Sequence, residues 1–301
     1  MIVARVPATS ANIGSGFDCF GLALSLFNDV ALMPDNAFGV EIVGEGAESL
    51  PRDRSNLVMR TVFRFFDMIG RRPPASFRLK LTNRIPMTGG LGSSSTALVG
   101  GLLVANRFVD DPVDRADLLR MAFELEGHPD NVAPAILGGF VLSVVDRGKL
   151  ITVPMAVPDR VKAVLFLPRF STSTREARRL LPSRVSHADA VFNLSRAALL
   201  VSALTSGRLD LLRVATQDRL HQPYRQVLFP TMPRFLEGAL EAGAVGSWLS
   251  GSGSALLAMT EGGEKSVAEA FESIARTNGV AGRSLIVDVE PHGAVILPPE
   301  S

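Results

Sequence analysis

The sequence predicts a two-domain protein of mixed strands and helices, and three observations support this expectation. The chain has 301 residues, which corresponds to about two domains at roughly 150 residues each. Segments with strand periodicity and segments with helix periodicity alternate along the chain, without an internal repeat. Turn residues around Pro154 and Pro158 precede a short apolar strand, which predicts a boundary between residues 1–157 and 158–301.

The clearest unit of the first half is a strand, a glycine-rich turn and a helix. Residues 76–82 are predicted to form a half-buried strand, because Phe77, Leu79 and Leu81 alternate with polar side chains. The glycine-rich turn follows, and a helix is predicted to start at about Ser94.

Further elements follow from local signals. Asp114 and Asp117 open a second predicted helix, which Gly127 ends. In the second half, periodicity predicts strands at 161–168, 254–259 and 284–291, two helical stretches within 188–222 and a helix at 265–279.

The composition is that of an ordinary globular protein, with 47% hydrophobic and 20% charged residues. The formal net charge is +1 and no basic tract is present, so we expect no nucleic acid and no membrane as a partner. Cys19 is the single cysteine, which excludes an intrachain disulfide and suits a reducing cytosol. The chain starts without a signal-peptide pattern and has no apolar run of about 18 residues, so a cytoplasmic location is expected.

Residues 86–106, PMTGGLGSSSTALVGGLLVAN, place a glycine-rich turn directly before a helix. Such a turn presents backbone N–H groups and the positive end of the helix dipole to one point, which favours a bound phosphate. A plain helix N-cap with flexible glycines is the alternative. No lysine lies in the loop and G-x-G-x-x-G is not satisfied, which excludes the Walker loop and the simple Rossmann fingerprint.

The segment PMTGGLGSSS (86–95) resembles the P-x-x-x-G-L-G-S-S-[SA] phosphate loop of the GHMP kinases. Two more segments occur in the order found in that family, VPATSANIGSGFDCFGLAL (6–24) and GSWLSGSGSALLAM (246–259). Within the family, 8–21 together with EGHPDNVAPAILGG (126–139) resembles the members that phosphorylate homoserine.

The resemblance implies an α+β fold with two domains. The first would be like ribosomal protein S5 domain 2 and the second ferredoxin-like, with ATP in the cleft. The last strand of the chain can, in this arrangement, lie in the first domain instead of the second. The implied reaction is ATP- and Mg²⁺-dependent phosphorylation of the L-homoserine hydroxyl to O-phospho-L-homoserine, a step towards threonine. A GHMP kinase acting on another small alcohol and a non-catalytic nucleotide-binding sensor stay open, and a homodimer is one expected state.

The resemblance also implies the residues that hold the nucleotide and the metal. Mg²⁺ would be bound by Ser94 and Glu126, since Mg²⁺ takes one or two protein oxygens beside phosphate and water. The nucleotide would be bound by Asn56, Pro86, Met87, Thr88, Gly89, Gly90, Leu91, Gly92, Ser93, Ser94, Ser95 and Thr96.

The substrate pocket needs a cationic fork for a carboxylate and an acceptor for an ammonium group. Arg178 and Arg225 are expected to hold the carboxylate, because the planar guanidinium suits a two-point grip. Two local alternatives exist: a capping box at Ser173 with Arg178 as an exposed helix residue, and a helix exit at 221–226. The implied substrate-binding residues are Asn12, Asp18, His128, Thr174, Arg178, Arg225 and Gly251.

The catalytic residues implied by the resemblance are Asn131 and Arg178. Phosphoryl transfer needs mainly positioning and charge stabilisation. We therefore expect Asn131 to orient the hydroxyl, which loses its proton to the γ-phosphate or to water. Asp130 is the alternative, as a general base.

Overall fold

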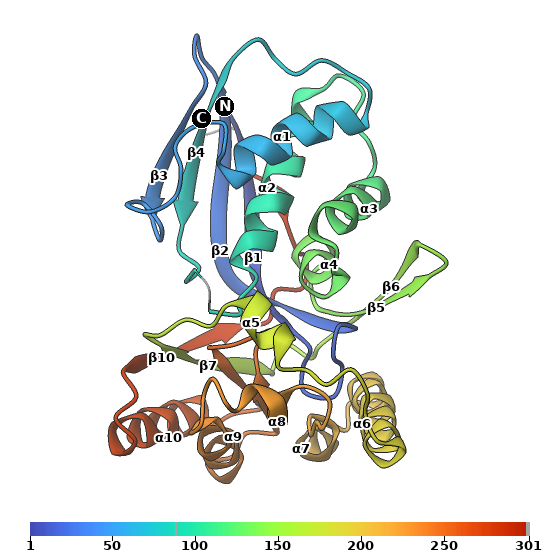
Figure 1. The fold of residues 1–301 in the computed structure, drawn as a ribbon, viewed down its shortest axis with the longest axis vertical. Coiled ribbons are helices and arrows are strands. Elements are labelled where there is room, and N and C mark those ends of the chain that lie inside the picture. The colour runs from blue at the N-terminus through green and yellow to red at the C-terminus, as the bar shows by residue number, and fades with distance from the viewer. Residues whose placement is uncertain (88, 299–301) are drawn as a thin grey trace.

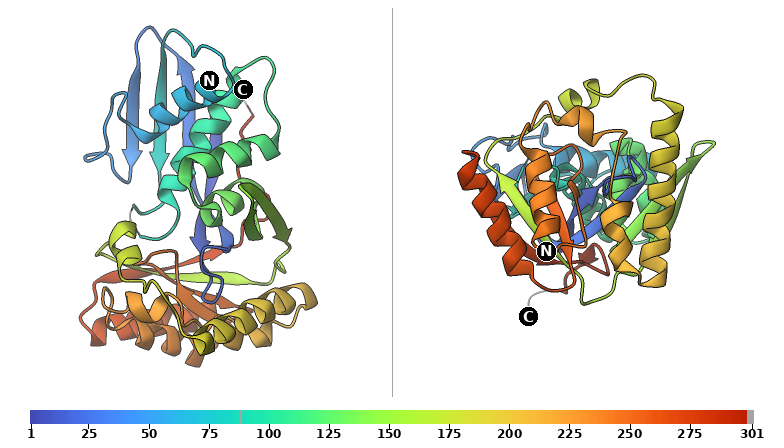
Figure 2. Two further views of the ribbon diagram at one scale, coloured as in Figure 1. Left: turned by 45° about the vertical axis from the view of Figure 1, so that its right-hand side comes forward. Right: turned by 90° about the horizontal axis from the view of Figure 1, so that it is seen from below.

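The computed structural model describes residues 1–87 and 89–298. It consists of two β-sheets, each covered on one face by helices, and the two units are stacked along the long axis of the molecule (Figures 1 and 2). Mixed strands and helices were predicted, and this α+β architecture confirms them.

The first sheet is built around one long strand. Strand β2 pairs through Asp29–Pro34 with β4 and through Phe20–Leu22 with β5. It therefore joins β4 to the hairpin of β5 and β6 within this sheet. The strand order is β11-β1-β2-β4-β3, with β6 paired to β5. The strands are β1 (Ile2–Ala11), β2 (Phe20–Pro34), β3 (Gly39–Gly44), β4 (Phe77–Asn83), β5 (Phe140–Asp146), β6 (Lys149–Met155) and β11 (Val295–Ile296).

Four helices cover one face of this sheet (Figure 1). They are α1 (Leu57–Met68), α2 (Ser93–Phe108), α3 (Arg115–Glu126) and α4 (Pro129–Leu137). Apolar side chains of β1, β2 and β4 form a core with those of α1 and α2, including the fully buried Phe65, Phe77 and Val99. Burial of this apolar face stabilises the helices beyond their own propensity.

The second sheet has the antiparallel order β10-β7-β9-β8. Counted in chain order this is 4-1-3-2, the arrangement of a ferredoxin-like domain. Its strands are β7 (Lys162–Pro168), β8 (Gly246–Leu249), β9 (Leu256–Thr260) and β10 (Gly282–Asp288). The helical segments of this half are α5 (Thr174–Arg179), α6 (His187–Ser206), η1 (Leu209–Leu211), α7 (Leu212–Ala215), α8 (Gln222–Arg225), α9 (Met232–Glu241) and α10 (Glu264–Thr277).

Several local predictions are confirmed. The predicted strand at 76–82 is β4, and Asp114 caps α3, which Gly127 ends in the left-handed conformation. The helix predicted at 265–279 is α10. Two local interpretations are wrong: Ser173 precedes α5 without forming a side-chain cap, and 221–226 starts α8 instead of ending a helix, because Pro223 lies in its first turn.

Helix α6 lies largely within the region 188–222, where two helical stretches were predicted. By length and composition alone, this 20-residue helix could cross a membrane. Asp189 and Arg196 interrupt its apolar run. Leu200, Ala203 and Leu204 of this helix are buried.

The ends of the chain bear on the domain division. The proposed boundary at 157/158 stays a prediction, and it falls in the segment between β6 and β7. Near the C-terminus, β11 pairs with β1, so Val295 and Ile296 lie on the first sheet.

Candidate active site

A cleft of about 350 Å³ lies where the two units meet. Its walls come from segments far apart in the sequence: the loop after β1, the glycine loop, the start of α4, the region of α5, α8 and the loop after β8. The lining residues are Ala11, Asn12, Asp18, Gly89, Gly90, Leu91, Gly92, Ser93, Ser94, Ser95, Glu126, His128, Asp130, Asn131, Thr172, Ser173, Thr174, Arg178, Arg225, Gly251 and Ser252.

The glycine loop leads into α2 with backbone conformations that favour glycine. Gly92 has φ 66° and precedes the helix without a side-chain cap, so the first N–H groups of α2 are not closed off by a capping side chain. A Cβ on Gly90 would come within 2.1 Å of the Ser250 carbonyl oxygen, where φ is +78°. The glycines therefore allow a close approach between this loop and the loop after β8.

Hydrogen bonds hold this loop in place from both units. The Ser250 hydroxyl donates to the Gly90 carbonyl at 2.7 Å, and the Ala255 N–H donates to the Gly89 carbonyl at 2.9 Å. From β1, the Thr9 N–H donates to the Leu91 carbonyl at 3.1 Å. The loop is thus held before any ligand arrives.

Glu126 lies beside the start of α2. Its Oε1 accepts a hydrogen bond from the Ser95 hydroxyl at 2.7 Å and lies 3.4 Å from the Ser94 hydroxyl. A carboxylate and hydroxyl oxygens are hard donors of the kind that Mg²⁺ prefers. Among residues 1–87 and 89–298, no group of three or more His, Cys, Asp or Glu side chains could hold a metal. The donor set therefore fits an Mg²⁺ that keeps phosphate and water ligands.

The start of α4 brings Asp130 and Asn131 to the cleft. The Thr9 hydroxyl donates to Asn131 Oδ1 at 2.8 Å, and Asn131 Nδ2 donates to Asp130 Oδ1 at 3.5 Å, so the amide group has one N–H left to offer. Asp130 is 4% exposed, and burial, together with the nearby Asp18 carboxylate, raises its pKa to about 7. This carboxyl group can therefore exchange a proton near neutral pH.

An ion pair joins the first loop to α5. Arg178 donates from Nη2 to Asp18 Oδ1 at 2.8 Å and from Nη1 to Asp18 Oδ2 at 3.1 Å. The pairing raises the pKa of Arg178. Asn12 shapes the same loop, because its Oδ1 accepts the Asp18 N–H and its Nδ2 donates to the Gly251 carbonyl.

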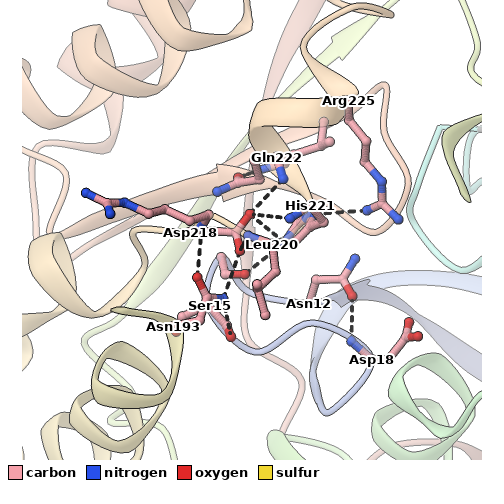
Figure 3. A network of polar contacts seen from close by, with 12 residues as sticks. Asn12, Ser15, Asp18, Asn193, Asp218, Leu220, His221, Gln222 and Arg225 are labelled. Atoms are coloured by element: carbon pink, nitrogen blue, oxygen red, sulfur yellow. Dashed lines mark hydrogen bonds and ion pairs between the residues drawn. The ribbon is translucent and has the colours of Figure 1, made fainter. Parts of the chain in front are cut away.

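Arg225 is a buried cation without a carboxylate partner. It is 3% exposed, and within the described part of the chain no carboxylate lies within ion-pair distance of it. Its Nη1 donates to His221 Nδ1 at 3.1 Å (Figure 3). The same Nη1 donates to the Gly251 carbonyl at 2.8 Å, while the buried Nε has no partner among the residues described. Burial and the nearby Arg178 lower the pKa of Arg225 to about 10. A buried cation of this kind favours an anionic ligand.

The predicted site residues divide into two groups. Most line the cleft, as the set above shows. Asn56 does not: it caps α1, with its Oδ1 accepting the Val58 N–H and its Nδ2 donating to Pro51. Pro86 and Met87 border a neighbouring cavity that also touches Gly89, and Thr96 is fully buried. Thr88 lies outside the described residues.

Several residues near the cleft were not predicted from the sequence. Thr172 and Ser252 line it, and the Thr174 hydroxyl lies 3.1 Å from that of Ser252. Asp218 and His221 lie behind Arg225 and were also missed. One signal was available, because an aspartate just ahead of Gln222 and Pro223 has the composition of a helix start.

A glycine loop before a helix N-terminus, an adjacent carboxylate and a charged cleft fit a small-molecule kinase. Family models agree with this class: residues 56–139 match the GHMP kinases N terminal domain, and 200–278 match the GHMP kinases C terminal model. The chain belongs to the GHMP kinase family, and its fold is the two-domain fold of that family.

Individual relatives are similar over nearly the whole chain. A homoserine kinase of Carboxydothermus hydrogenoformans is 41% identical over 298 residues, which cover 99% of this chain and 97% of the relative. A homoserine kinase of Moorella thermoacetica is 41% identical over 299 residues, or 99% and 100%. The crystal structure of homoserine kinase from Cytophaga hutchinsonii has a TM-score of 0.89 at 28% identity, covering 98% and 97%.

Proposed function

We propose that this protein transfers the γ-phosphoryl group of ATP to the side-chain hydroxyl of L-homoserine, giving O-phospho-L-homoserine for threonine biosynthesis. The names of its full-length relatives support this reaction. The observation in the structure that carries the proposal is Arg225, a buried cation that faces the cleft without an ionic partner.

The charges of the cleft suit an α-amino acid. A carboxylate fits Arg225, with Arg178 nearby, and an ammonium group fits the Asp18 carboxylate. A substrate with only a hydroxyl, such as a neutral sugar, would leave Arg225 buried and unpaired, which is costly. His128, Thr174 and Gly251 line the same cleft and are proposed to complete this substrate pocket.

The phosphate groups of ATP are proposed to lie on the glycine loop and the start of α2. Asn131 is proposed to orient the substrate hydroxyl by donating an N–H to its oxygen, since Thr9 occupies the amide oxygen. The proton then leaves to a γ-phosphate oxygen or to water. The roles of Asn56, Pro86, Met87 and Thr96 in nucleotide binding stay predictions.

Mg²⁺ is proposed to be held by Ser94 and Glu126. When bound, it would neutralise charge between the β- and γ-phosphates. A cytoplasmic location and a homodimer are further expectations, the second of which light scattering can measure.

The first experiment is an assay of ADP release from ATP and Mg²⁺ with L-homoserine, beside mevalonate, galactose, L-serine and L-threonine. We expect turnover with homoserine, lost in Glu126→Ala with the circular dichroism spectrum unchanged. Turnover with another alcohol would replace the proposed substrate, whereas ATP binding without turnover on any acceptor would indicate a sensor.

A further inference from the structure

A buried polar network lies behind the cleft on the side of the second domain (Figure 3). We call Asp218, His221 and Asn193 the Asp218 relay. The side chains of Asp218 and His221 are both fully buried. None of the three residues lines the cleft, yet the relay contacts both Arg225 and the loop that carries Asp18.

Asp218 organises the start of α8. Its Oδ1 accepts from Asn193 Nδ2 at 2.9 Å and from the Leu220 N–H at 2.8 Å. Its Oδ2 accepts from the N–H groups of His221 at 3.0 Å and Gln222 at 2.7 Å. Because these four donors satisfy the buried carboxylate, they fix the backbone from which His221 and Arg225 project.

The surroundings of His221 select one tautomer of its ring. Nε2 lies 2.8 Å from the Gly14 carbonyl oxygen and 3.5 Å from Asp218 Oδ2, and both of these atoms only accept hydrogen bonds. Nε2 must therefore carry the hydrogen. Burial lowers the pKa of His221 to about 4, so the ring is neutral near pH 7 and Nδ1 keeps its lone pair. Nδ1 thus accepts the hydrogen bond from Arg225 Nη1.

Arg225 is held by one end of its guanidinium group. The two hydrogens of Nη1 are directed to His221 Nδ1 and to the Gly251 carbonyl. Nη2 is then left for a ligand, whereas the buried Nε has no partner among the residues described. A charged hydrogen bond from Nη2 to a carboxylate fits this arrangement.

We infer that Asp218 and His221 are positioning residues that set the rotation of the Arg225 guanidinium group for the carboxylate of the substrate. The inference rests on the proposed function, because the carboxylate is that of L-homoserine. His221 serves as a neutral hydrogen-bond acceptor for Arg225 and touches no reacting atom.

The same relay fixes the opposite side of the substrate pocket. His221 donates to the Gly14 carbonyl, and Asn193 Nδ2 donates to the Ser15 carbonyl at 3.2 Å. The Phe17 ring stacks on the His221 ring at 5.2 Å and lies 5.3 Å from the Arg225 guanidinium carbon. The relay thereby sets the spacing between the groups proposed for the carboxylate and the ammonium.

Two substitutions at His221 separate its two contacts. His221→Gln can keep a donor to Gly14 near the position of Nε2 but loses the acceptor for Arg225. His221→Asn can keep an acceptor near the position of Nδ1 but loses the donor. We expect the KM for L-homoserine to rise by about tenfold or more in His221→Gln and by less than about threefold in His221→Asn. The KM for ATP should stay unchanged in both, and kcat should fall by less than about threefold.

A double-mutant cycle tests whether His221 acts through Arg225. In an Arg225→Met background, His221→Gln should change kcat/KM for homoserine by less than about twofold. Asn106→Ala is the stability control, because Asn106 bridges both backbone groups of Val113 far from the cleft. It should lower the melting temperature with KM unchanged.

Three results would overturn the inference. In the first, both His221 variants shift only the melting temperature, as the control does. In the second, the effects of His221→Gln and Arg225→Met on kcat/KM for homoserine multiply independently. Finally, a wild-type chain that does not turn over homoserine would overturn the proposed function and this inference together. Turnover in the wild type is therefore measured first. If the wild type is active and the His221 variants keep its KM for homoserine, only the inference about the relay fails.

Discussion

The two walls of the cleft present positive charge to a ligand in different ways. The glycine loop and the start of α2 offer backbone N–H groups from one continuous segment, held by carbonyl contacts with Ser250 and Ala255. The opposite wall offers whole charges on Arg178 and Arg225, which come from α5 and α8 and are oriented by Asp18 and His221.

The difference has an energetic consequence. Backbone dipoles at a helix start carry no net charge, so a phosphate site built from them has a small desolvation cost when it is empty. A buried guanidinium group without a counterion is costly, and the pKa of Arg225 lowered to about 10 reflects that cost. The phosphate wall depends on shape, whereas the substrate wall depends on a buried charge that its ligand neutralises.

The largest expected effect comes from altering the shape of the phosphate wall. Gly90→Ala places a Cβ 2.1 Å from the Ser250 carbonyl oxygen at φ +78°. Because neither backbone can give way cheaply, we expect kcat/KM for homoserine to fall by more than about 10³-fold, with a raised KM for ATP.

Gly148→Ala is the matched control for this prediction. Gly148 has φ +79°, and a Cβ there meets nothing within 4 Å. It carries the same backbone strain without the close approach, and its kcat/KM should stay within about twofold. Similar activity of the two variants would show that the approach to Ser250 is unimportant.

Removing the charge of the other wall should act on one ligand only. Arg225→Met is expected to lower kcat/KM for homoserine by about 10³-fold, because the substrate carboxylate loses its buried partner. The thermal shift caused by homoserine should vanish, while the shift caused by ATP persists. Arg213→Met, which removes an exposed ion pair with Glu237, serves as the control and should change neither shift. Equal loss of both shifts would contradict the division between the walls.

The phosphate wall was predictable from sequence because its parts are contiguous. Local rules also gave β4, α3 and its end at Gly127. The substrate wall was predictable only as a set of residue types from a resemblance. Its geometry depends on contacts between positions far apart, such as Ser15 with Asn193 and Gly14 with His221, for which no local periodicity exists.

Two local patterns have more than one structural outcome. The pattern at Ser173 satisfies a capping box, yet the hydroxyl makes no cap. Residues 221–226 have the composition of a helix end, but Asp218 and Pro223 make them a helix start. The adenine role of Asn56 stays a prediction: its Oδ1 caps α1 by accepting the Val58 N–H, and its Nδ2 donates to the Pro51 carbonyl. At 221–226 the deciding contacts are local ones that composition alone does not rank.

Asp130 tests whether the substrate wall contains a base. The folded chain keeps this proton up to about pH 7, whereas the unfolded chain releases it near 3.8, so its contribution to stability is lost as pH rises through 7. We expect Asp130→Asn to raise the free energy of unfolding at pH 8 by about 3 kcal/mol, less than the full linkage of about 4 because the amide adds buried N–H groups.

The same variant should keep kcat within about tenfold, since Asn131 is proposed to orient the hydroxyl without a base. Denaturant unfolding at pH 8 and steady-state kinetics provide the two measurements. Asp111→Asn, at an exposed side chain, is the control and should change neither. A fall in kcat by several orders of magnitude with homoserine binding retained would make Asp130 the base.

The smallest effect concerns the acid stability of the relay behind the substrate wall. The unfolded chain protonates His221 below its ordinary pKa of 6.5, whereas burial keeps the folded ring neutral down to about 4. The unfolded state therefore binds more protons between these values, and His221 should cost the wild type about 2 kcal/mol of stability between pH 7 and pH 5.

In His221→Gln this part of the loss should disappear, so the difference between the two unfolding free energies should shrink or reverse as pH falls. His187→Gln, at an exposed histidine where α6 starts, should follow the wild-type curve. Parallel curves for wild type and His221→Gln would mean that burial does not lower the pKa of His221. The ring would then be charged below about pH 6.5, where its Nδ1 could not accept the hydrogen bond that orients Arg225.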